Sequence, residues 1–305
     1  MYVLKPVTIT DSNLTSNIPE PDTGEAEWLV GSTYAAGDEV ISLATHTKYK
    51  SNAGGNIGND PDSETYDSDG IGANWTIYGK SNRYSMFSGV IGTQSTESTQ
   101  IQVDFDASVI VNGLSVFNVS AQTANVTMDD PIDGEVYNKD IDMRDNSQVV
   151  DWYTYFLEPI VEKRRFSLWD LPGYPNATVT LTLGSTGDVA CGECVIGQQI
   201  NLGAALYGTG FQLLNFNVTE RDAFGNIVKT TDRRTAKLAK YNVHTPTARS
   251  EYVFNVLDDL RDTACVWSGS VDNDKTLIYG YHADARVNYS TPSLDDITIE
   301  VEGLT

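Results

Sequence analysis

The sequence lacks several features, and each absence argues against a class of protein. Its 305 residues contain no run of eighteen apolar residues, so we expect no membrane span. Basic residues are scarce, with 20 Lys and Arg against 42 Asp and Glu and a net charge of −22. This balance disfavours nucleic acid and anionic membranes as partners. Residues 1–20 contain no continuous apolar segment and no small-residue cleavage site, so no signal peptide is expected.

Cysteine and histidine are also scarce, with three of each. Three cysteines are too few, and odd in number, for a disulfide framework. Cys191-Gly-Glu-Cys194 has the spacing of half a zinc knuckle, but no second half follows. We therefore expect small buried thiols around a turn, as suits a reducing cytoplasm. The histidines have neither metal-ligand spacing nor an adjacent acid that would orient them: His46, His244 and His282.

No catalytic constellation is recognisable. No serine lies in a Gly-x-Ser-x-Gly elbow, and no glycine-rich phosphate loop follows a strand. Among 42 acids, no pair of glycosidase carboxylates can be singled out. The acidic loop from Asp60 to Gly70 lacks the Glu that completes an EF-hand, so a solvated loop is expected there and Ca²⁺ binding remains the alternative. The sequence predicts no enzyme, no catalytic residue, no metal site and no cofactor.

An aromatic-rich stretch from Trp28 to Trp75 dominates the first quarter of the chain. The turn Gly37-Asp38 precedes the apolar pair Val40-Ile41, and Thr47 to Lys50 is the expected partner strand. So short a unit cannot bury a large apolar core, so a few large rings must hold it together. Trp28 is the expected core ring. Rings left exposed can stack on sugars, although each also fits core packing; the candidates are Tyr34, Tyr49, Trp75 and Tyr78.

The order of these residues resembles a known kind of module. A first Trp, a Tyr, a Gly-Asp turn, a strand ending in Tyr, an Asn/Gly loop with a Pro and a final Trp follow one another. This order is similar to the chitin- and cellulose-binding modules of carbohydrate-binding families five and twelve. The resemblance implies a small aromatic-rich β module over residues 21–80 that binds a glycan.

The sequence predicts that the remaining chain is mainly β. Alternating apolar residues at Gln100–Phe105, Ser115–Val119, Asn125–Met128 and Ala177–Leu183 predict an antiparallel, jelly-roll-like β-sandwich over residues 81–205. Residues 206–305 are expected to form a β-barrel-like domain. One helix, from Glu251 to Leu260, should flank it, because its apolar residues fall on one face.

The first twenty residues are polar apart from a strand-like run, Val7 to Thr10. We expect residues 1–20 to form an extended arm that adds a strand to a neighbouring subunit, with a loosely ordered terminus as the alternative.

A second resemblance concerns the whole chain. Ser81 to Phe87 resembles the segment that follows such modules in tailed-bacteriophage structural proteins, and the strand and helix order after residue 206 resembles their tail-tube-like and distal-tail barrels. The resemblance implies a structural protein of the tail or tail tip, assembled in the host cytoplasm into a virion. Its implied partners are other tail proteins, further copies of itself in a homo-oligomer, and a host-surface glycan during adsorption. Two alternatives stay open: a secreted polysaccharide-degrading enzyme with a binding module, and a purely structural tail subunit without sugar binding.

Overall fold

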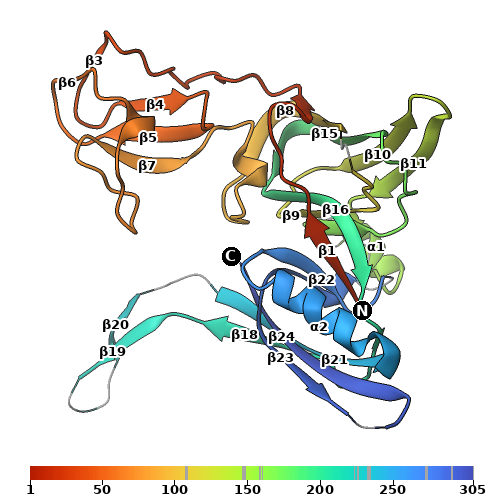
Figure 1. The fold of residues 1–305 in the computed structure, drawn as a ribbon. Helices are drawn as coiled ribbons and strands as arrows, with labels where there is room; N and C mark the ends of the chain where they lie inside the picture. Colours follow the sequence, from red (N-terminus) through yellow and green to blue (C-terminus); the bar gives the residue numbers. More distant parts are fainter. Residues whose placement is uncertain are drawn as a thin grey trace.

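The structure is a computed structural model. It describes residues 1–106, 109–145, 149–157, 159, 161–222, 224, 227–231, 235–271, 274–289 and 291–304. Strands dominate it, with two α-helices among the described residues (Figure 1). The predicted mainly-β class is therefore confirmed.

A ten-stranded antiparallel sheet runs through most of the molecule. Nine strands follow one another in the order β14 (Arg165–Leu168), β9 (Gly113–Phe117), β16 (Glu193–Asn201), β1 (Tyr2–Pro6), β22 (Cys265–Ser268), β23 (Leu277–Asn288), β24 (Leu294–Gly303), β21 (Thr235–Pro246) and β17 (Ala204–Ala205). The tenth, β18 (Gly210–Asn215), pairs with β21. Strands from both predicted domains, 81–205 and 206–305, thus belong to one continuous sheet.

A second sheet of five strands covers the β14-β9-β16 end of the first. Its order is β11 (Gly134–Asp142), β10 (Thr123–Asp130), β15 (Thr178–Cys191), β8 (Ser95–Asp106) and β2 (Leu14–Ser16). Alternate side chains of both sheets meet in one buried cluster, for example Val103 and Leu181 from one sheet and Val116 from the other. The predicted sandwich is confirmed, because period-two apolar patterns on facing strands require such a shared core.

The N-terminal strand occupies an unexpected place. β1 pairs with β16 on one side and with β22 on the other, at the centre of the large sheet. Val3 and Leu4 are fully buried, Val3 in the C-terminal core and Leu4 in the core between the two halves. The prediction of an extended arm over residues 1–20 is therefore wrong. The strand also lies earlier than the expected Val7–Thr10.

The helix α2 (Thr247–Asp259) covers the C-terminal part of the large sheet, which curls around it (Figure 1). Its buried residues Val253, Val256 and Leu257 share a core with Trp267 and Ile299 of the sheet. This confirms the predicted flanking helix. Among the described residues, no helix is both long and apolar enough to span a membrane.

A two-stranded ribbon extends from the edge of this sheet (Figure 1). β18 pairs with the first half of β21, and β19 (Val218–Arg221) pairs with β20 (Ile227–Thr231) beyond it. β21 contacts β24 only from Leu238 onward. The part of the ribbon before Leu238 therefore has no other strand beside it within the described chain.

The predicted module forms a small β unit of its own. Its sheets are β4 (Glu39–Ser42), β5 (Thr47–Ser51) and β7 (Trp75–Lys80) in one, and β3 (Thr33–Tyr34) and β6 (Asn56–Ile57) in the other. Three buried side chains, Val40, Tyr49 and Trp75, form its core. The 3-10 helix η1 (Pro61–Ser63) lies in its acidic loop, and η2 (Ser85–Phe87) follows the module at the junction.

The remaining elements are short: β12 (Arg144–Asp145), β13 (Val161–Glu162), α1 (Trp152–Leu157) and the 3-10 helix η3 (Asp274–Thr276). No residue of α1 is buried. All three cysteines are free and buried, and Cys191 and Cys194 flank the turn between β15 and β16. This agrees with the predicted small buried thiols.

Candidate functional site

Two of the four predicted sugar-stacking rings lie inside the module. Tyr49 is 4% exposed and Trp75 is fully buried. The Trp75 indole N–H donates to the Asn59 carbonyl oxygen at 2.9 Å, so its polar edge is satisfied in the core. The prediction that these two rings form a sugar surface is wrong. In so small a unit the large rings supply most of the buried apolar area, so they cannot also face solvent.

Tyr34 and Trp28 have intermediate positions. Tyr34 is half-buried and packs edge-on against Trp75, with ring centroids 5.3 Å apart. Its hydroxyl oxygen accepts a hydrogen bond from the Leu29 backbone N–H at 2.7 Å. Trp28 packs against the same core but remains partly exposed. Tyr34 and Trp28 therefore both pack against the module core while part of each side chain faces solvent.

Tyr78 is the predicted ring that faces solvent. Its side chain is 60% exposed at the β7 bulge opposite Lys48 and Tyr49. The Lys50 ammonium lies 5.5 Å from its ring centroid and forms an ion pair with Glu39. Thr76 lies two residues before Tyr78 on β7, and its hydroxyl donates to the side-chain oxygen of Asn52, just after β5, at 2.7 Å. We define these residues, Glu39, Lys50, Asn52, Thr76 and Tyr78, as the Tyr78 face.

The acidic loop is used to hold the module together. Asp62 accepts hydrogen bonds from the hydroxyls of Ser42, Thr45 and Tyr49. Asp60 accepts from the Asp62 backbone N–H at 3.0 Å and so caps η1. Since hydroxyl donors already surround Asp62, this carboxylate belongs to the fold of the module and is not turned outward to a cation.

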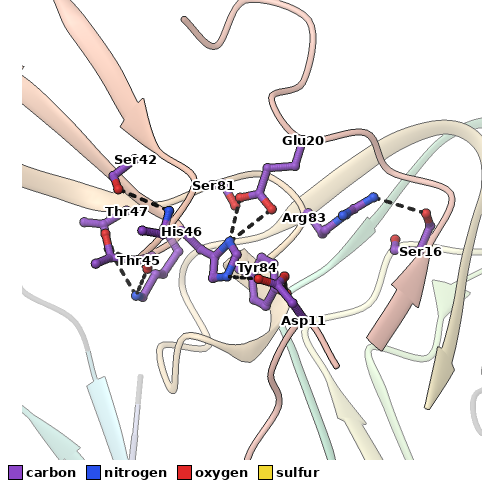
Figure 2. Close-up of polar contacts among 12 residues, drawn as sticks. Asp11, Ser16, Glu20, Ser42, Thr45, His46, Thr47, Ser81, Arg83 and Tyr84 are labelled. Carbon is purple, nitrogen blue, oxygen red and sulfur yellow. Dashed lines mark hydrogen bonds and ion pairs between the residues drawn. The ribbon is translucent and has the colours of Figure 1, made fainter. Parts of the chain in front are cut away.

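His46 joins the module to the rest of the chain (Figure 2). It lies in the β4–β5 turn with a φ of 53°, a conformation that His adopts more readily than most residues. Its Nδ1 lies 3.1 Å from the Glu20 carboxylate and its Nε2 lies 3.3 Å from Asp11. The ring stacks on Tyr84 at 3.8 Å, and the Tyr84 hydroxyl donates to Asp11 at 2.6 Å. We call Asp11, Glu20, His46 and Tyr84 the His46 joint.

The His46 joint brings together residues that sequence reasoning did not connect. The sequence suggested that no acid orients a histidine, and this is wrong for His46 and also for His244, whose Nδ1 contacts Asp296. Glu20 and His46 are 26 positions apart, so no local motif signals the contact. The only sequence signal was the aromatic junction after Ser81, which contains Tyr84.

The His46 joint also has metal-binding donor types. One ring nitrogen and two carboxylate oxygens lie within 4.8 Å of one another. The two carboxylates, however, face different nitrogens of the ring. An ion bound at one nitrogen would therefore reach the second acid only after a side-chain rearrangement. The geometry fits a joint that fixes the module, in which each ring nitrogen of His46 contacts one of the two acids.

A crevice of about 470 Å³ separates this joint from the large sheet. His46, Lys80 and Tyr84 line one side of it, and Glu193 and Tyr279 line the other. The Glu193 side chain accepts a hydrogen bond from the Gly89 backbone N–H at 2.9 Å and another from the Tyr279 hydroxyl. Burial raises the pKa of Glu193 to about 8, because the charged form loses its water. This carboxyl group is therefore mostly neutral at neutral pH, which suits a buried position beside Tyr279.

Comparisons with known proteins identify no relative of this chain: no family model, no curated protein and no solved structure matches it.

Proposed function

We propose that this chain is a structural subunit of a tailed-bacteriophage tail or tail tip, and that its module contacts host-surface glycans through the Tyr78 face. The observation that carries the glycan part is the exposed Tyr78 ring beside polar side chains. A flat ring buries the apolar face of a pyranose at little entropic cost, while Lys50 and Asn52 offer hydrogen bonds to its hydroxyls.

The Tyr78 face favours weak binding that depends on many copies. One stacking contact contributes about 1 kcal/mol, so a face with a single ring binds a sugar at roughly millimolar concentration. Such affinity is useful when many copies act together on one surface. A subunit of a multi-copy particle meets this condition, which ties the two parts of the proposal together.

Exposed apolar elements support the subunit part. The helix α1 exposes Trp152, Tyr153 and Phe156 by more than 70% each, and the ribbon exposes Leu213 and Phe224 by 75% and 90%. Large exposed apolar groups that lie together mark surfaces that another molecule covers.

A purely structural subunit without sugar binding is the second candidate. The burial of Tyr49 and Trp75 favours it, because only one ring remains to stack on a sugar. The difference between the two candidates lies in the Tyr78 face alone.

Retention on glycan surfaces tests the proposal. The full chain, displayed in many copies on a bead, should be retained on immobilised chitin, cellulose or peptidoglycan. Tyr78→Ala should abolish retention, and Tyr207→Ala should not, because Tyr207 is a fully exposed tyrosine outside the module.

Three results would change the conclusion. If the wild type is not retained on any of the three glycans, the purely structural role replaces the glycan role. If Tyr78→Ala is retained as well as the wild type, the Tyr78 face is not the site. Release of reducing sugar from any of the glycans would point to the polysaccharide-degrading enzyme.

A further inference from the structure

The ribbon of β18–β21 presents apolar side chains that nothing in the described chain covers. Leu213 of β18 is 75% exposed, Phe216 after this strand is 45% exposed and Val218 of β19 is 42% exposed, and Val228 of β20 is 68% exposed. An isolated two-stranded ribbon is at best marginally stable in water. Beside β19 and β20 no further strand pairs within the described chain, and such open edges favour pairing with another chain. The exposed apolar side chains and open edges of the ribbon therefore favour contact with a partner.

The amino-acid composition of residues 210–240 differs in charge from that of the whole chain. Residues 210–240 contain six of the 20 Lys and Arg but only three of the 42 Asp and Glu. A tenth of the chain thus carries nearly a third of its basic residues. Lys229 lies exposed on β20, next to Val228. Lys240 is paired with Glu300 and Lys237 donates to the Lys275 carbonyl oxygen, whereas Lys229 is exposed, so an acidic face on a partner would complement Lys229.

The hairpin of β10 and β11 provides an acidic face with a groove. Residues 129–145 contain seven Asp and Glu against two basic residues. A groove of about 890 Å³ lies there, lined among others by Asp140, Asp142 and Glu162. Its one basic lining residue, Arg144, is already paired with Asp142 at 3.0 Å. β11 is also the edge strand of its sheet, so its outer backbone groups have no strand partner in the described chain.

The ribbon cannot reach this groove within one molecule. Figure 1 places β19 and β20 at the lower left and the β10–β11 hairpin at the upper right, at opposite ends of the fold. Contact between them therefore requires two copies. Because the two surfaces differ, a docked pair still has one free groove, on the copy that gave its ribbon, and one free ribbon on the other copy, so the contact can repeat from copy to copy.

We propose that the ribbon of one copy docks into the acidic β10–β11 groove of a second copy, in a head-to-tail contact. The side chains of Phe224 and Val228 leave water there, and Lys229 meets Asp140 and Glu162. This inference rests on the subunit part of the proposed function and is independent of glycan binding.

Charge reversal on the full-length chain tests the contact. Sedimentation velocity over a range of protein concentrations should show wild-type oligomers that weaken as salt rises. Lys229→Glu and Glu162→Lys should each weaken association by roughly tenfold or more, since each places like charges opposite one another. A mixture of the two variants should regain association, because the reversed ribbon then meets the reversed groove. Arg261→Glu is the matched control, because this exposed Arg lies on neither surface.

Cross-linking gives an independent readout. The native cysteines are buried, so a bismaleimide should react only with cysteines introduced on the surface. Phe224→Cys chains mixed with Gln122→Cys chains should yield cross-linked pairs, since Gln122 lines the groove. Each variant alone should yield few.

The outcomes separate the inference from the proposed function. Wild-type chains that stay monomeric at every concentration would overturn both the head-to-tail contact and the homo-oligomer. If the wild type assembles and both charge reversals assemble as well as Arg261→Glu, the contact is wrong and the subunit role remains. Loss of glycan retention with normal assembly would remove only the glycan role.

Discussion

The Tyr49 hydroxyl donates a 2.9 Å hydrogen bond to the carboxylate of Asp62, and this contact fixes the ring in the core of the module. The sequence presents Tyr49 as a ring for sugar stacking and Asp62 as part of a solvated loop. The fold pairs them with each other. The acidic loop thus closes over the module core, whereas Tyr78 is exposed to solvent.

The three aromatic positions of the module should respond differently to substitution. Trp75→Ala should lower the free energy of unfolding by about 3–5 kcal/mol, because it empties a fully buried site. Tyr49→Phe should cost about 1–2 kcal/mol through the lost hydrogen bond to Asp62. Tyr78→Ala should stay within about 0.5 kcal/mol of wild type, since the ring is exposed. Urea unfolding of the full chain measures all three effects. A loss of stability in Tyr78→Ala as large as that in Trp75→Ala would contradict the exposure of Tyr78 and the burial of Trp75.

Neighbouring positions of β1 should show how much the N-terminal strand contributes. Leu4→Ala should cost about 2–5 kcal/mol, because the side chain is fully buried between the two halves. Lys5→Ala, on the same strand but exposed, should change stability by less than about 0.5 kcal/mol. Thermal unfolding monitored by circular dichroism distinguishes them. Equal melting temperatures for both variants would mean that β1 is a dispensable terminus.

Removing His46 should destabilise the joint. In His46→Asn the new residue suits the left-handed backbone but no longer contacts both acids, and the Glu20 side chain is only 4% exposed. Leaving a buried carboxylate without its partner should cost about 3 kcal/mol. His244→Asn is the matched control, because its pair with Asp296 is more than a third exposed and should contribute less than about 1 kcal/mol. Urea unfolding tests the difference, and limited proteolysis should cut His46→Asn first near the module junction.

The buried Glu193 predicts a pH dependence of stability. Its pKa is about 8 in the folded chain and near 4.5 in the unfolded chain, so the folded state holds a proton that the unfolded state releases between these values. The contribution of Glu193 to stability is therefore complete below about pH 4.5, falls as the pH rises, and is lost through pH 8. Glu193→Gln should match the wild type near pH 5 and exceed it by roughly a few kcal/mol at pH 9. Urea unfolding at both pH values checks this, with the exposed Glu135→Gln as a control that should show no such difference.

The sequence predicted those features that depend on local periodicity. The alternation at Ala177–Leu183 became β15, and the apolar face around Val253 became α2, because one buried face determines each pattern. The Gly37-Asp38 turn and the β4–β5 hairpin were predicted from local turn chemistry. Local patterns also predict that Cys191 and Cys194 lie around a turn.

Features set by distant contacts were not predictable in this way. Whether Tyr49 or Tyr78 faces solvent depends on the bulge between β5 and β7, which shifts the register after Lys48. The role of β1 depends on strands some two hundred residues away, so its short apolar run looks like a free arm. The His46 joint requires the module and the N-terminal segment to fold back on each other. None of these contacts leaves a repeating pattern in the chain.

The central place of β1 also determines the order in which the chain can fold. Tyr2 pairs with Asn201 on one side and Ser268 on the other, so β1 is completed by strands that lie much later in the sequence. During synthesis, residues 2–6 must remain without these partners until residues 197–201 and 266–268 have emerged. Contacts of such long sequence separation slow folding, because a large loop must close before any pairing stabilises it. Closure of the large sheet by β1 should therefore be the late step that makes the two halves one cooperative unit.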